Sequence, residues 1–269
     1  TYTYGVGTPF EKTALKGISV TIENGEFLGI IGHTGSGKST FVQHLNGLLH
    51  PTTGKVTVNG VDVSEKTDEA KHMRHKVGMV FQYPEHQLFE ETIAEDIAFG
   101  PKNLGLDAEE VDRRVREAMA FVGLDYDTYA ERSPFHLSGG QMRRVAIAGV
   151  VAMEPDFLVL DEPSAGLDPF GREEIFDEII KLHKEKDVTV ILVSHNMEDI
   201  SRMANRLIVL DKGQIVLDGK PLDIFNHHRH VLQQVGVDVP PVSVLIESLR
   251  NRGLDVSNEV LTVDDAVQA

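Results

Sequence analysis

The chain has 269 residues, of which 42 are acidic and 26 basic, and its formal net charge is −16. Nucleic-acid-binding domains normally present a basic face, so we expect no nucleic-acid partner; the acidity is typical of a cytosolic protein that its charge keeps soluble. The absence of cysteine excludes a disulfide framework and a thiolate metal site. No apolar run reaches the ~20 residues that span a bilayer, so we expect any work at a membrane to go through a partner.

The N-terminal part predicts strands, a helix and a hairpin. The chain opens on Thr1–Tyr4 without an initiator Met, and because these residues already alternate like a strand we expect a few residues to precede them. Residues 38–49 are apolar at helical spacing and predict a helix that stops before Pro51. The Asn59-Gly60 pair lies between alternating segments and predicts a hairpin. Further strands are predicted at 18–22, 27–32 and 77–81.

Helical and strand character alternate in the rest of the chain. Residues 83–150 predict short, polar helices with prolines in their loops, the clearest at 108–124. The Lys212-Gly213 pair predicts a second hairpin, and the clearest helix of the tail covers 240–254. Buried parallel strands, which read as continuous β-branched or leucine runs, are predicted at 157–160, 188–193 and 206–210.

This order of elements predicts an α/β fold with a nucleotide-type core. We place the core at residues 1–220, with an antiparallel β-subdomain and with a helical subdomain inserted at about 83–150. Residues 221–269 are predicted to form a small C-terminal extension.

Residues 32–40, GHTGSGKST, lie between a predicted strand and a predicted helix, as a phosphate-binding loop must. Its glycines let backbone N–H groups turn inward around phosphate oxygens, and the following helix adds its positive end. The Lys38 ammonium can reach the β- and γ-phosphates, and the Ser39 hydroxyl can bind Mg²⁺. We predict nucleotide contacts from Gly32, His33, Thr34, Gly35, Ser36, Gly37, Lys38, Ser39 and Thr40.

Asp161 and Glu162 stand at the carboxyl end of a predicted buried strand. Adjacent residues on a strand point to opposite faces, so one carboxylate can hold the shell of a Mg²⁺ ion while the other polarises an attacking water. The alternative is an acidic strand end that only faces solvent, which is a weaker interpretation beside a phosphate-binding loop.

Residues 137–141, LSGGQ, contain no titratable side chain. The hydroxyl of Ser138, the backbone N–H groups of Gly139 and Gly140, and the N-terminus of the following helix can together form a second anion nest. Such a nest can neutralise the charge that spreads over a transferred phosphoryl group. The motif therefore predicts a contribution to phosphoryl transfer made by dipoles alone.

With these motifs the chain resembles the ATP-binding cassette ATPases over residues 1–220. Residues 32–40 are similar to the Walker A loop of that family, 158–161 to its Walker B strand and 137–141 to its signature. Four further matches are Gln82 to the Q-loop, 164–168 to the D-loop, His195 to the switch histidine, and Tyr4 to the adenine-stacking aromatic. Tyr2 lies on the same strand face as Tyr4, so the choice between the two rings stays open.

The resemblance implies a site shared between two cassettes, in which the signature of one subunit closes on the ATP held by the other. It implies catalytic roles for Glu162, which would activate water, and His195, which would hold the γ-phosphate. It implies a Mg²⁺ site formed by Ser39, Gln82 and Asp161. Its further nucleotide contacts would be Tyr4, Ser138, Gly139, Gly140, Gln141 and Asp168.

A narrower resemblance covers residues 81–105, which are similar to the ATPase subunits of energy-coupling factor transporters, and among these to the second of the two ATPase types. That family imports vitamins and metal ions in prokaryotes. The resemblance implies a peripheral protein on the cytoplasmic face of the cell membrane, with a second ATPase subunit, a transmembrane coupling subunit and a substrate-binding membrane subunit as partners. Pro84–Glu91 would face the coupling subunit, with Leu88 and Phe89 as apolar anchors, unless both belong to the core of the helical subdomain. The tail at 230–254 would hold two ATPases together.

Three questions stay open from the sequence. His227, His228 and His230 could bind a metal, but only Asp223 lies close by and a solvated helix start is the better interpretation. The pair of cassettes could be a homodimer or a heterodimer. A different ABC importer or exporter, or a soluble cassette protein acting on DNA or ribosomes, is the alternative function; the chain has neither a long coiled-coil insertion nor a second cassette.

Overall fold

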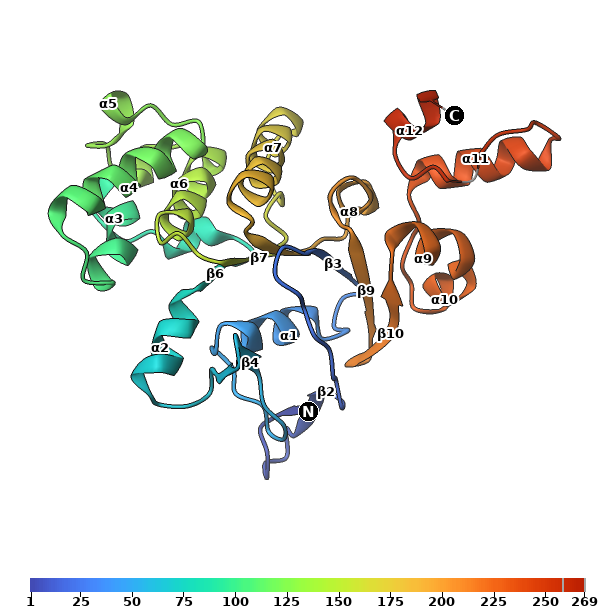
Figure 1. The fold of residues 1–269 in the computed structure, drawn as a ribbon, viewed down its shortest axis with the longest axis horizontal. Coiled ribbons are helices and arrows are strands. Elements are labelled where there is room, and N and C mark those ends of the chain that lie inside the picture. Colours follow the sequence, from blue (N-terminus) through green and yellow to red (C-terminus); the bar gives the residue numbers. More distant parts are fainter. Residues whose placement is uncertain (258, 269) are drawn as a thin grey trace. The chain divides into compact units, whose positions relative to one another are not determined.

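The computed structural model describes residues 1–257 and 259–268, which form two compact units. The first unit contains residues 1–56 and 190–269, and the second contains 57–189. Figure 1 labels the elements of both units in chain order. The predicted α/β class is confirmed, while the predicted domain limits at 220 and 221 stay predictions.

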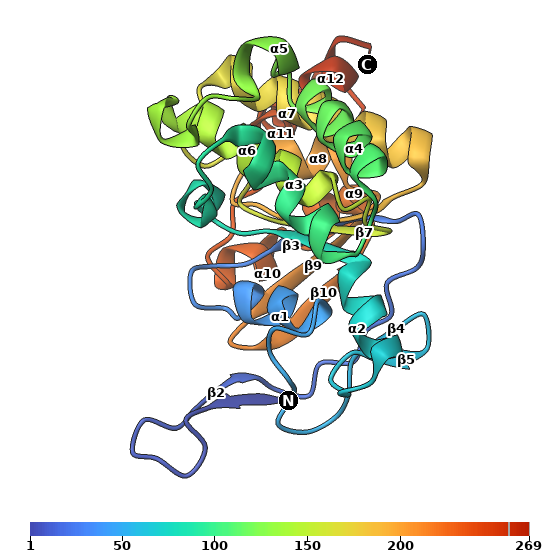
Figure 2. The same ribbon diagram turned by 90° about the vertical axis from the view of Figure 1, so that its left-hand side faces the viewer.

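The core of the first unit is a set of parallel strands. Strand β3 (Phe27–Ile31) pairs in parallel with β8 (Thr189–Val193) and with β9 (Arg206–Asp211), and all five of its residues are buried. Helices α1 (Lys38–Leu45) and α8 (Met197–Met203) lie on opposite faces of these strands (Figures 1 and 2). Coverage of both faces explains why the strands read as unbroken apolar runs.

The second predicted hairpin is confirmed as β9 followed by antiparallel β10 (Gln214–Gly219). Both residues of its turn have positive φ, 47° at Lys212 and 81° at Gly213, which is the backbone that a tight two-residue hairpin requires.

The N-terminal ribbon differs from the prediction. Strand β1 (Tyr2–Tyr4) pairs antiparallel with β2 (Lys12–Leu15), and Figure 2 shows this ribbon at the N-terminus. No strand forms at 18–22, although half-buried and exposed residues alternate there as expected. Alternation indicates that one side of a segment is buried, but a strand also needs a neighbouring strand to which its backbone can bond. Among the described residues, this segment pairs with no other strand.

Short helices complete the first unit: α9 (Pro221–His227), α10 (Arg229–Gln234), α11 (Pro241–Asn251) and α12 (Val263–Gln268). The Arg229 guanidinium donates to the Phe225 carbonyl at 3.1 Å and to the Ser243 carbonyl at 2.9 Å, and it also pairs with Glu247. This arginine thereby ties α9 to α11, the helix that the sequence predicts at 240–254.

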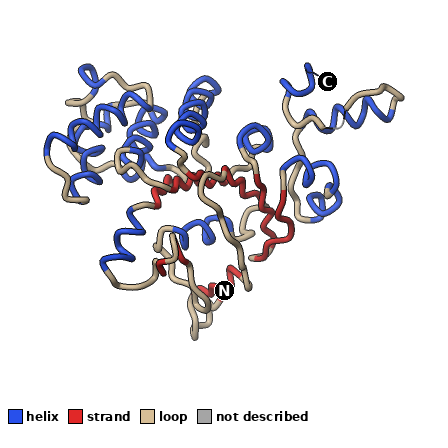
Figure 3. The backbone as a smooth tube through the Cα atoms, in the orientation of Figure 1, coloured by secondary structure: helices blue, strands red, loops and turns tan. Residues whose placement is uncertain are grey.

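The second unit begins with the first predicted hairpin, β4 (Thr57–Val58) and β5 (Val61–Asp62), whose Asn59-Gly60 turn again has two positive φ values. Helix α2 (Asp68–His75) leads to β6 (Val77–Val80), which pairs in parallel with β7 (Phe157–Asp161). Helix α7 (Pro169–Lys186) follows β7. Figure 3 distinguishes these strands from the surrounding helices.

The helical character predicted for 83–150 is confirmed. The segment contains η1 (Pro84–Gln87), α3 (Ile93–Asn103), α4 (Ala108–Phe121), α5 (Tyr126–Tyr129), η2 (Pro134–His136) and α6 (Gly139–Val151). Buried side chains such as Ile97, Met119 and Ile147 form the contact between α3, α4 and α6. Within the described part of the chain, no helix has the length and apolar character that a membrane span needs.

Candidate functional site

The predicted site residues divide between the two units. The first unit carries Tyr4, Gly32, His33, Thr34, Gly35, Ser36, Gly37, Lys38, Ser39, Thr40 and His195. The second carries Gln82, Ser138, Gly139, Gly140, Gln141, Asp161, Glu162 and Asp168.

The phosphate-binding loop connects β3 to α1, as the sequence predicts. A Cβ atom at Gly32 would lie 2.3 Å from the Leu210 carbonyl oxygen, so the close approach of β9 admits no side chain there. Gly37, with φ at 107°, stands at the N-cap of α1 and provides no side-chain cap. The first N–H groups of α1 are therefore left for another acceptor, which is the arrangement that a phosphate group satisfies.

Lys38 is buried and folds back over this loop. Its ammonium donates to the carbonyl oxygens of Gly32 at 2.6 Å and His33 at 3.1 Å. The hydroxyl of Ser36 is fully buried and has no hydrogen-bond partner among the described residues. A cation and an unsatisfied hydroxyl at a helix N-terminus fit an anionic ligand and fit the phosphates of a nucleotide.

Tyr4 lies against the end of the same loop. Its hydroxyl is 3.1 Å from the Thr40 hydroxyl, and its ring makes an edge contact with Tyr2 at 4.7 Å between centroids. Tyr2 in turn contacts the His44 ring at 4.8 Å. Tyr4 is the outer, exposed ring of this row, which favours Tyr4 over Tyr2 as the stacking surface for a base.

His44 ends this aromatic row inside the protein. Burial lowers its pKa, and the Thr40 carbonyl, 2.6 Å from Nδ1, raises it by a smaller amount. The Nε2 atom is buried and has no hydrogen-bond partner among the described residues. The ring is thus neutral packing for Tyr2, whose own pKa is raised by burial and by Tyr4.

His195 lies two residues after the end of β8 and is exposed, in keeping with a residue that meets a ligand. The next residue, Asn196, caps α8 by accepting from the N–H groups of Glu198 and Asp199. The cap fixes the point where the chain turns from strand into helix, and so fixes the position of His195.

In the second unit, Asp161 is the buried last residue of β7, and Glu162 follows with φ at 54°. A left-handed backbone is uncommon for glutamate and turns the chain sharply at the strand end. Asp168 caps α7 by accepting from the Gly171 N–H at 2.9 Å. The structure thus gives Asp168 a local role beside the nucleotide contact that the sequence predicts.

The signature begins helix α6 with a capping box. Ser138 is the N-cap and accepts from the Gln141 N–H, while the Gln141 side chain accepts from the Ser138 N–H at 3.1 Å. Gly139 and Gly140 occupy the first turn, and a Cβ on Gly139 would meet no heavy atom within 4 Å. The residues predicted to form an anion nest therefore stand at the start of a helix, with open space at Gly139, and the Gln141 side chain completes the capping box. The nest itself stays a prediction.

Two residues that the sequence did not identify fasten this helix. The Arg143 guanidinium binds the Glu85 carboxylate of η1 through Nε at 3.1 Å and Nη2 at 2.8 Å, and both side chains are largely buried. Arg144 donates to the Val122 carbonyl at 3.0 Å and to the Glu174 carboxylate of α7 at 2.5 Å. Two arginines in an otherwise apolar helix are the signal that could have revealed these contacts.

The two predicted apolar anchors after the Q-loop differ. Leu88 is buried and belongs to the core, as the alternative interpretation held, whereas Phe89 is 56 % exposed. The Phe89 ring makes an edge contact with Phe99 at 4.8 Å, and Phe99 is also exposed. The exposed apolar surface here is therefore a pair of aromatic rings, one from the loop and one from α3.

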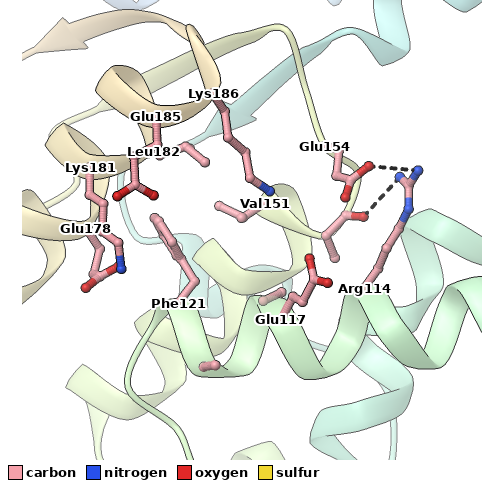
Figure 4. A pocket seen from close by; sticks show the side chains of 13 residues that line it. Arg114, Glu117, Phe121, Val151, Glu154, Glu178, Lys181, Leu182, Glu185 and Lys186 are labelled. Atoms are coloured by element: carbon pink, nitrogen blue, oxygen red, sulfur yellow. Dashed lines mark hydrogen bonds and ion pairs between the residues drawn. The ribbon is translucent and has the colours of Figure 1, made fainter.

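A hollow of about 330 Å³ in the second unit lies between α4, α7 and the end of α6 (Figure 4). Arg114 pairs there with Glu154 at 2.9 Å and donates to the Met153 carbonyl at 3.2 Å, while Phe121 and Leu182 supply apolar surface. Most of its charged groups pair with a charged neighbour, and none of its lining residues belongs to the predicted site; those in pairs are Arg114, Glu117, Glu154, Glu178 and Lys181.

The histidines near 228 lie at the junction of α9 and α10, and His227 and His230 are exposed. Across residues 1–257 and 259–268, no three or more His, Cys, Asp or Glu side chains are grouped so that they could hold a metal ion. The exposure of His227 and His230 supports the interpretation as a solvated helix start.

The loop, the strand-end carboxylates and the signature helix define the class of P-loop proteins with an ATP-binding cassette. A family described as "ABC transporter" matches residues 15–165. The chain is 57 % identical to the energy-coupling factor transporter ATP-binding protein EcfA2 of Clostridium perfringens, over 97 % of this chain and 92 % of that protein. It is 50 % identical to the protein of the same name from Clostridioides difficile, over 100 % of this chain and 93 % of that protein.

Solved structures agree with this assignment. The cbiO1 structure from Clostridium perfringens, described as part of the ABC transporter complex cbiONQ, has a TM-score of 0.74 and 34 % identity over 91 % of this chain and 96 % of that chain. A dimeric, post-hydrolysis ATP-binding cassette bound to ADP and Pi has a TM-score of 0.73 and 32 % identity over 81 % of this chain and 95 % of that chain. The chain belongs to the ABC transporter family.

Proposed function

We propose that this chain is the ATP-binding and hydrolysing subunit of an energy-coupling factor importer and drives the uptake of vitamins or metal ions through a membrane partner. The observation that carries the proposal is the similarity to EcfA2 proteins over nearly the whole chain, which includes the segment after Gln82 and the tail. The uncapped start of α1 beside Lys38 supports binding of a nucleoside triphosphate.

Within the site, Lys38 and the loop N–H groups hold the β- and γ-phosphates. Ser39, Gln82 and Asp161 provide the hydroxyl, amide and carboxylate oxygens that suit Mg²⁺, which when bound neutralises charge between the phosphates. Glu162 orients and activates the attacking water, and His195 holds the γ-phosphate. The burial of Asp161 and the turn at Glu162 support these roles, because they separate the two carboxylates at the strand end.

The active site is shared between two cassettes, which form either a homodimer or a heterodimer. Ser138, Gly139 and Gly140 of one cassette stabilise the charge that develops on the ATP of the other. The open first turn of α6 supports this role, because the N-terminus of a helix carries a partial positive charge. Preferential binding of ATP to the closed pair shifts the population from open to closed.

The membrane partner contacts the segment Pro84–Glu91, where Phe89 and the neighbouring Phe99 offer exposed aromatic surface. A separate membrane subunit selects the transported substrate. The extension at 221–269 holds the two cassettes together. The protein is peripheral on the cytoplasmic face of the cell membrane.

The proposal is tested by gently solubilising the native membranes, isolating the chain and identifying its partners by mass spectrometry. The expected set is a second cassette, a helical coupling protein and a small substrate-binding membrane protein. Recovery with a different class of permease would indicate another ABC importer or exporter. Recovery with ribosomes or DNA would contradict transport and leave the ATPase chemistry untouched.

The hydrolytic role of Glu162 is tested separately. Glu162→Gln keeps the size of the side chain and removes its basicity, so we expect ATP binding and dimer closure to persist while turnover falls by about 10²-fold or more. Turnover within a few-fold of wild type would show that another group activates the water.

A further inference from the structure

Three aromatic rings form a row that leads from the surface into the first unit, beside the phosphate-binding loop. The centroids of the Tyr4 and Tyr2 rings are 4.7 Å apart with their planes at 87°, and those of Tyr2 and His44 are 4.8 Å apart with their planes at 79°. Exposure falls along the row, from 41 % at Tyr4 through half-buried Tyr2 to 4 % at His44. The ring that can stack on a base therefore leans on a second ring, which leans on a buried third.

The row joins one face of a strand to one face of a helix. Tyr2 and Tyr4 are two positions apart on β1, the spacing that places side chains on the same side of a strand. Thr40 and His44 are four positions apart on α1, the spacing that places side chains on the same side of a helix. Near-perpendicular packing is an arrangement that aromatic rings favour, so each ring of the row restricts the tilt of the next.

Thr40 connects both ends of the row to α1. Its hydroxyl lies 3.1 Å from the Tyr4 hydroxyl, and its carbonyl oxygen lies 2.6 Å from Nδ1 of His44. Thr40 is also the last residue of the phosphate-binding loop and follows Lys38 by two positions. The helix that begins at the predicted phosphate site therefore also holds the ring that would meet the base.

Backbone bonds fix strand β1 but do not fix the direction of the Tyr4 side chain. The Thr3 N–H donates to the Thr52 hydroxyl at 2.9 Å, and the Thr52 N–H donates to the Thr1 carbonyl at 2.9 Å. Strand β1 also pairs with β2. A fixed backbone still leaves several staggered rotamers open to an exposed tyrosine, so the choice among them falls to the contacts of its ring.

We propose that Tyr2 and His44 are positioning residues that hold the Tyr4 ring at a fixed place relative to the phosphate-binding loop, so that one nucleotide engages both. This inference rests on the proposed binding of a nucleotide by that loop. Tyr2 acts on Tyr4 directly, and His44 acts through Tyr2. A ring that is already oriented loses little rotamer freedom when a base stacks on it, and this preorganisation raises the affinity. The gain applies to a ligand with an aromatic base and not to bare phosphates.

The test compares ADP with pyrophosphate by calorimetry on the full chain, because both carry two phosphates and only ADP carries a base. We expect Tyr4→Leu to lower ADP affinity by roughly tenfold or more, within the range of base stacking on an aromatic ring. Tyr2→Leu and His44→Leu should lower it by roughly threefold to tenfold, the size of one aromatic edge contact. Pyrophosphate affinity should stay at the wild-type value in all three variants.

Two control variants separate positioning from general damage. Tyr2→Phe keeps the ring and should bind ADP like wild type. His183→Leu matches His44→Leu, because Nδ1 of His183 also lies near a backbone carbonyl, that of Val188 at 2.8 Å, but on α7. It should bind both ligands like wild type. Equal losses of ADP and pyrophosphate affinity in Tyr2→Leu and His44→Leu would overturn the proposal, and so would unchanged ADP affinity.

A measurement without ligand separates this inference from the proposed function. Three-bond NMR couplings about χ1 of Tyr4, whose signals Tyr4→Phe identifies, should report one rotamer in wild type and averaging in Tyr2→Leu and His44→Leu. One unchanged rotamer in both variants, or averaging already in wild type, would overturn the inference. If Tyr2→Leu does not fold, His44→Leu supports both tests. Failure of wild type to bind ADP would instead contradict the proposed nucleotide function, and the couplings would still decide the role of the row.

Discussion

Arg143 of the signature helix holds Glu85, 58 positions earlier, through both carboxylate oxygens in a largely buried, bidentate ion pair. Glu85 belongs to η1, the segment proposed to face the membrane partner, and Arg143 lies five residues after Ser138. The same guanidinium borders Gly166 of the D-loop, because a Cβ there would lie 3.3 Å from its Nη1. One side chain therefore connects three motifs of the second unit.

We expect Arg143→Met to lower the free energy of unfolding by about 3 kcal/mol, because it leaves the Glu85 carboxylate buried without its cation. Urea denaturation measures the change. The double variant Arg143→Met with Glu85→Gln should recover part of the loss, since it removes the uncompensated charge. A single variant within about 0.5 kcal/mol of wild type would mean that water replaces the pair.

Ser138 caps helix α6, and we propose that it also acts in the reaction; a comparison with Thr67 separates the two roles. Each residue is an N-cap whose hydroxyl accepts a hydrogen bond from the backbone N–H of the third residue of its helix. The Thr67 hydroxyl lies 3.1 Å from the Ala70 nitrogen. Alanine at either position should cost about 1 kcal/mol of stability in thermal unfolding. Only Ser138→Ala should also lower steady-state ATP turnover, by roughly tenfold, because Thr67 belongs to no predicted site. Equal turnover in the two variants would contradict a role for the hydroxyl in the reaction.

Gly213 and Gly60 occupy equivalent positions in two hairpin turns, with φ at 81° and 83°. Their surroundings differ: a Cβ at Gly213 would lie 2.3 Å from the Ala14 carbonyl oxygen, while one at Gly60 meets no heavy atom within 4 Å. Gly60→Ala should cost about 1 kcal/mol, the strain of a left-handed alanine. Gly213→Ala should cost at least about 2 kcal/mol more, because backbone must move. Similar losses of unfolding free energy in chemical denaturation would show that strand β2 shifts at little cost to make room for the new side chain.

The buried position of His44 should lower the free energy of unfolding in mild acid. Burial lowers its pKa in the folded protein below the ordinary value of 6.5, so the unfolded chain takes up the proton first. Its contribution is fully present above about pH 6.5 and is lost as the pH falls toward the lowered pKa. His44→Gln should show a shallower decline in the free energy of unfolding between about pH 7.5 and about pH 5. A decline as steep as in wild type would assign the effect to other groups.

Local sequence patterns determine many of the strands and turns of this chain. Continuous apolar runs predict β3, β7, β8 and β9, because strands covered on both faces need no polar side. The two residue pairs at 59–60 and 212–213 predict their hairpins, because a tight turn needs backbone that few residues adopt. The glycine spacing of 32–40 predicts the phosphate-binding loop for the same reason.

Tertiary structure alone decides the contacts between distant residues. Periodicity predicts a strand at 18–22 and misses the strand at 12–15, because a strand forms only where the segment reaches a backbone partner, here β1. It could not separate buried Leu88 from exposed Phe89, which are neighbours of equal hydrophobic character. The Arg143–Glu85 and His33–Asp211 pairs join positions 58 and 178 apart. Such pairs form because packing of the whole unit brings the two side chains together, and in the case of Arg143 and Glu85 it also removes them from water. A local sequence pattern carries no record of that packing.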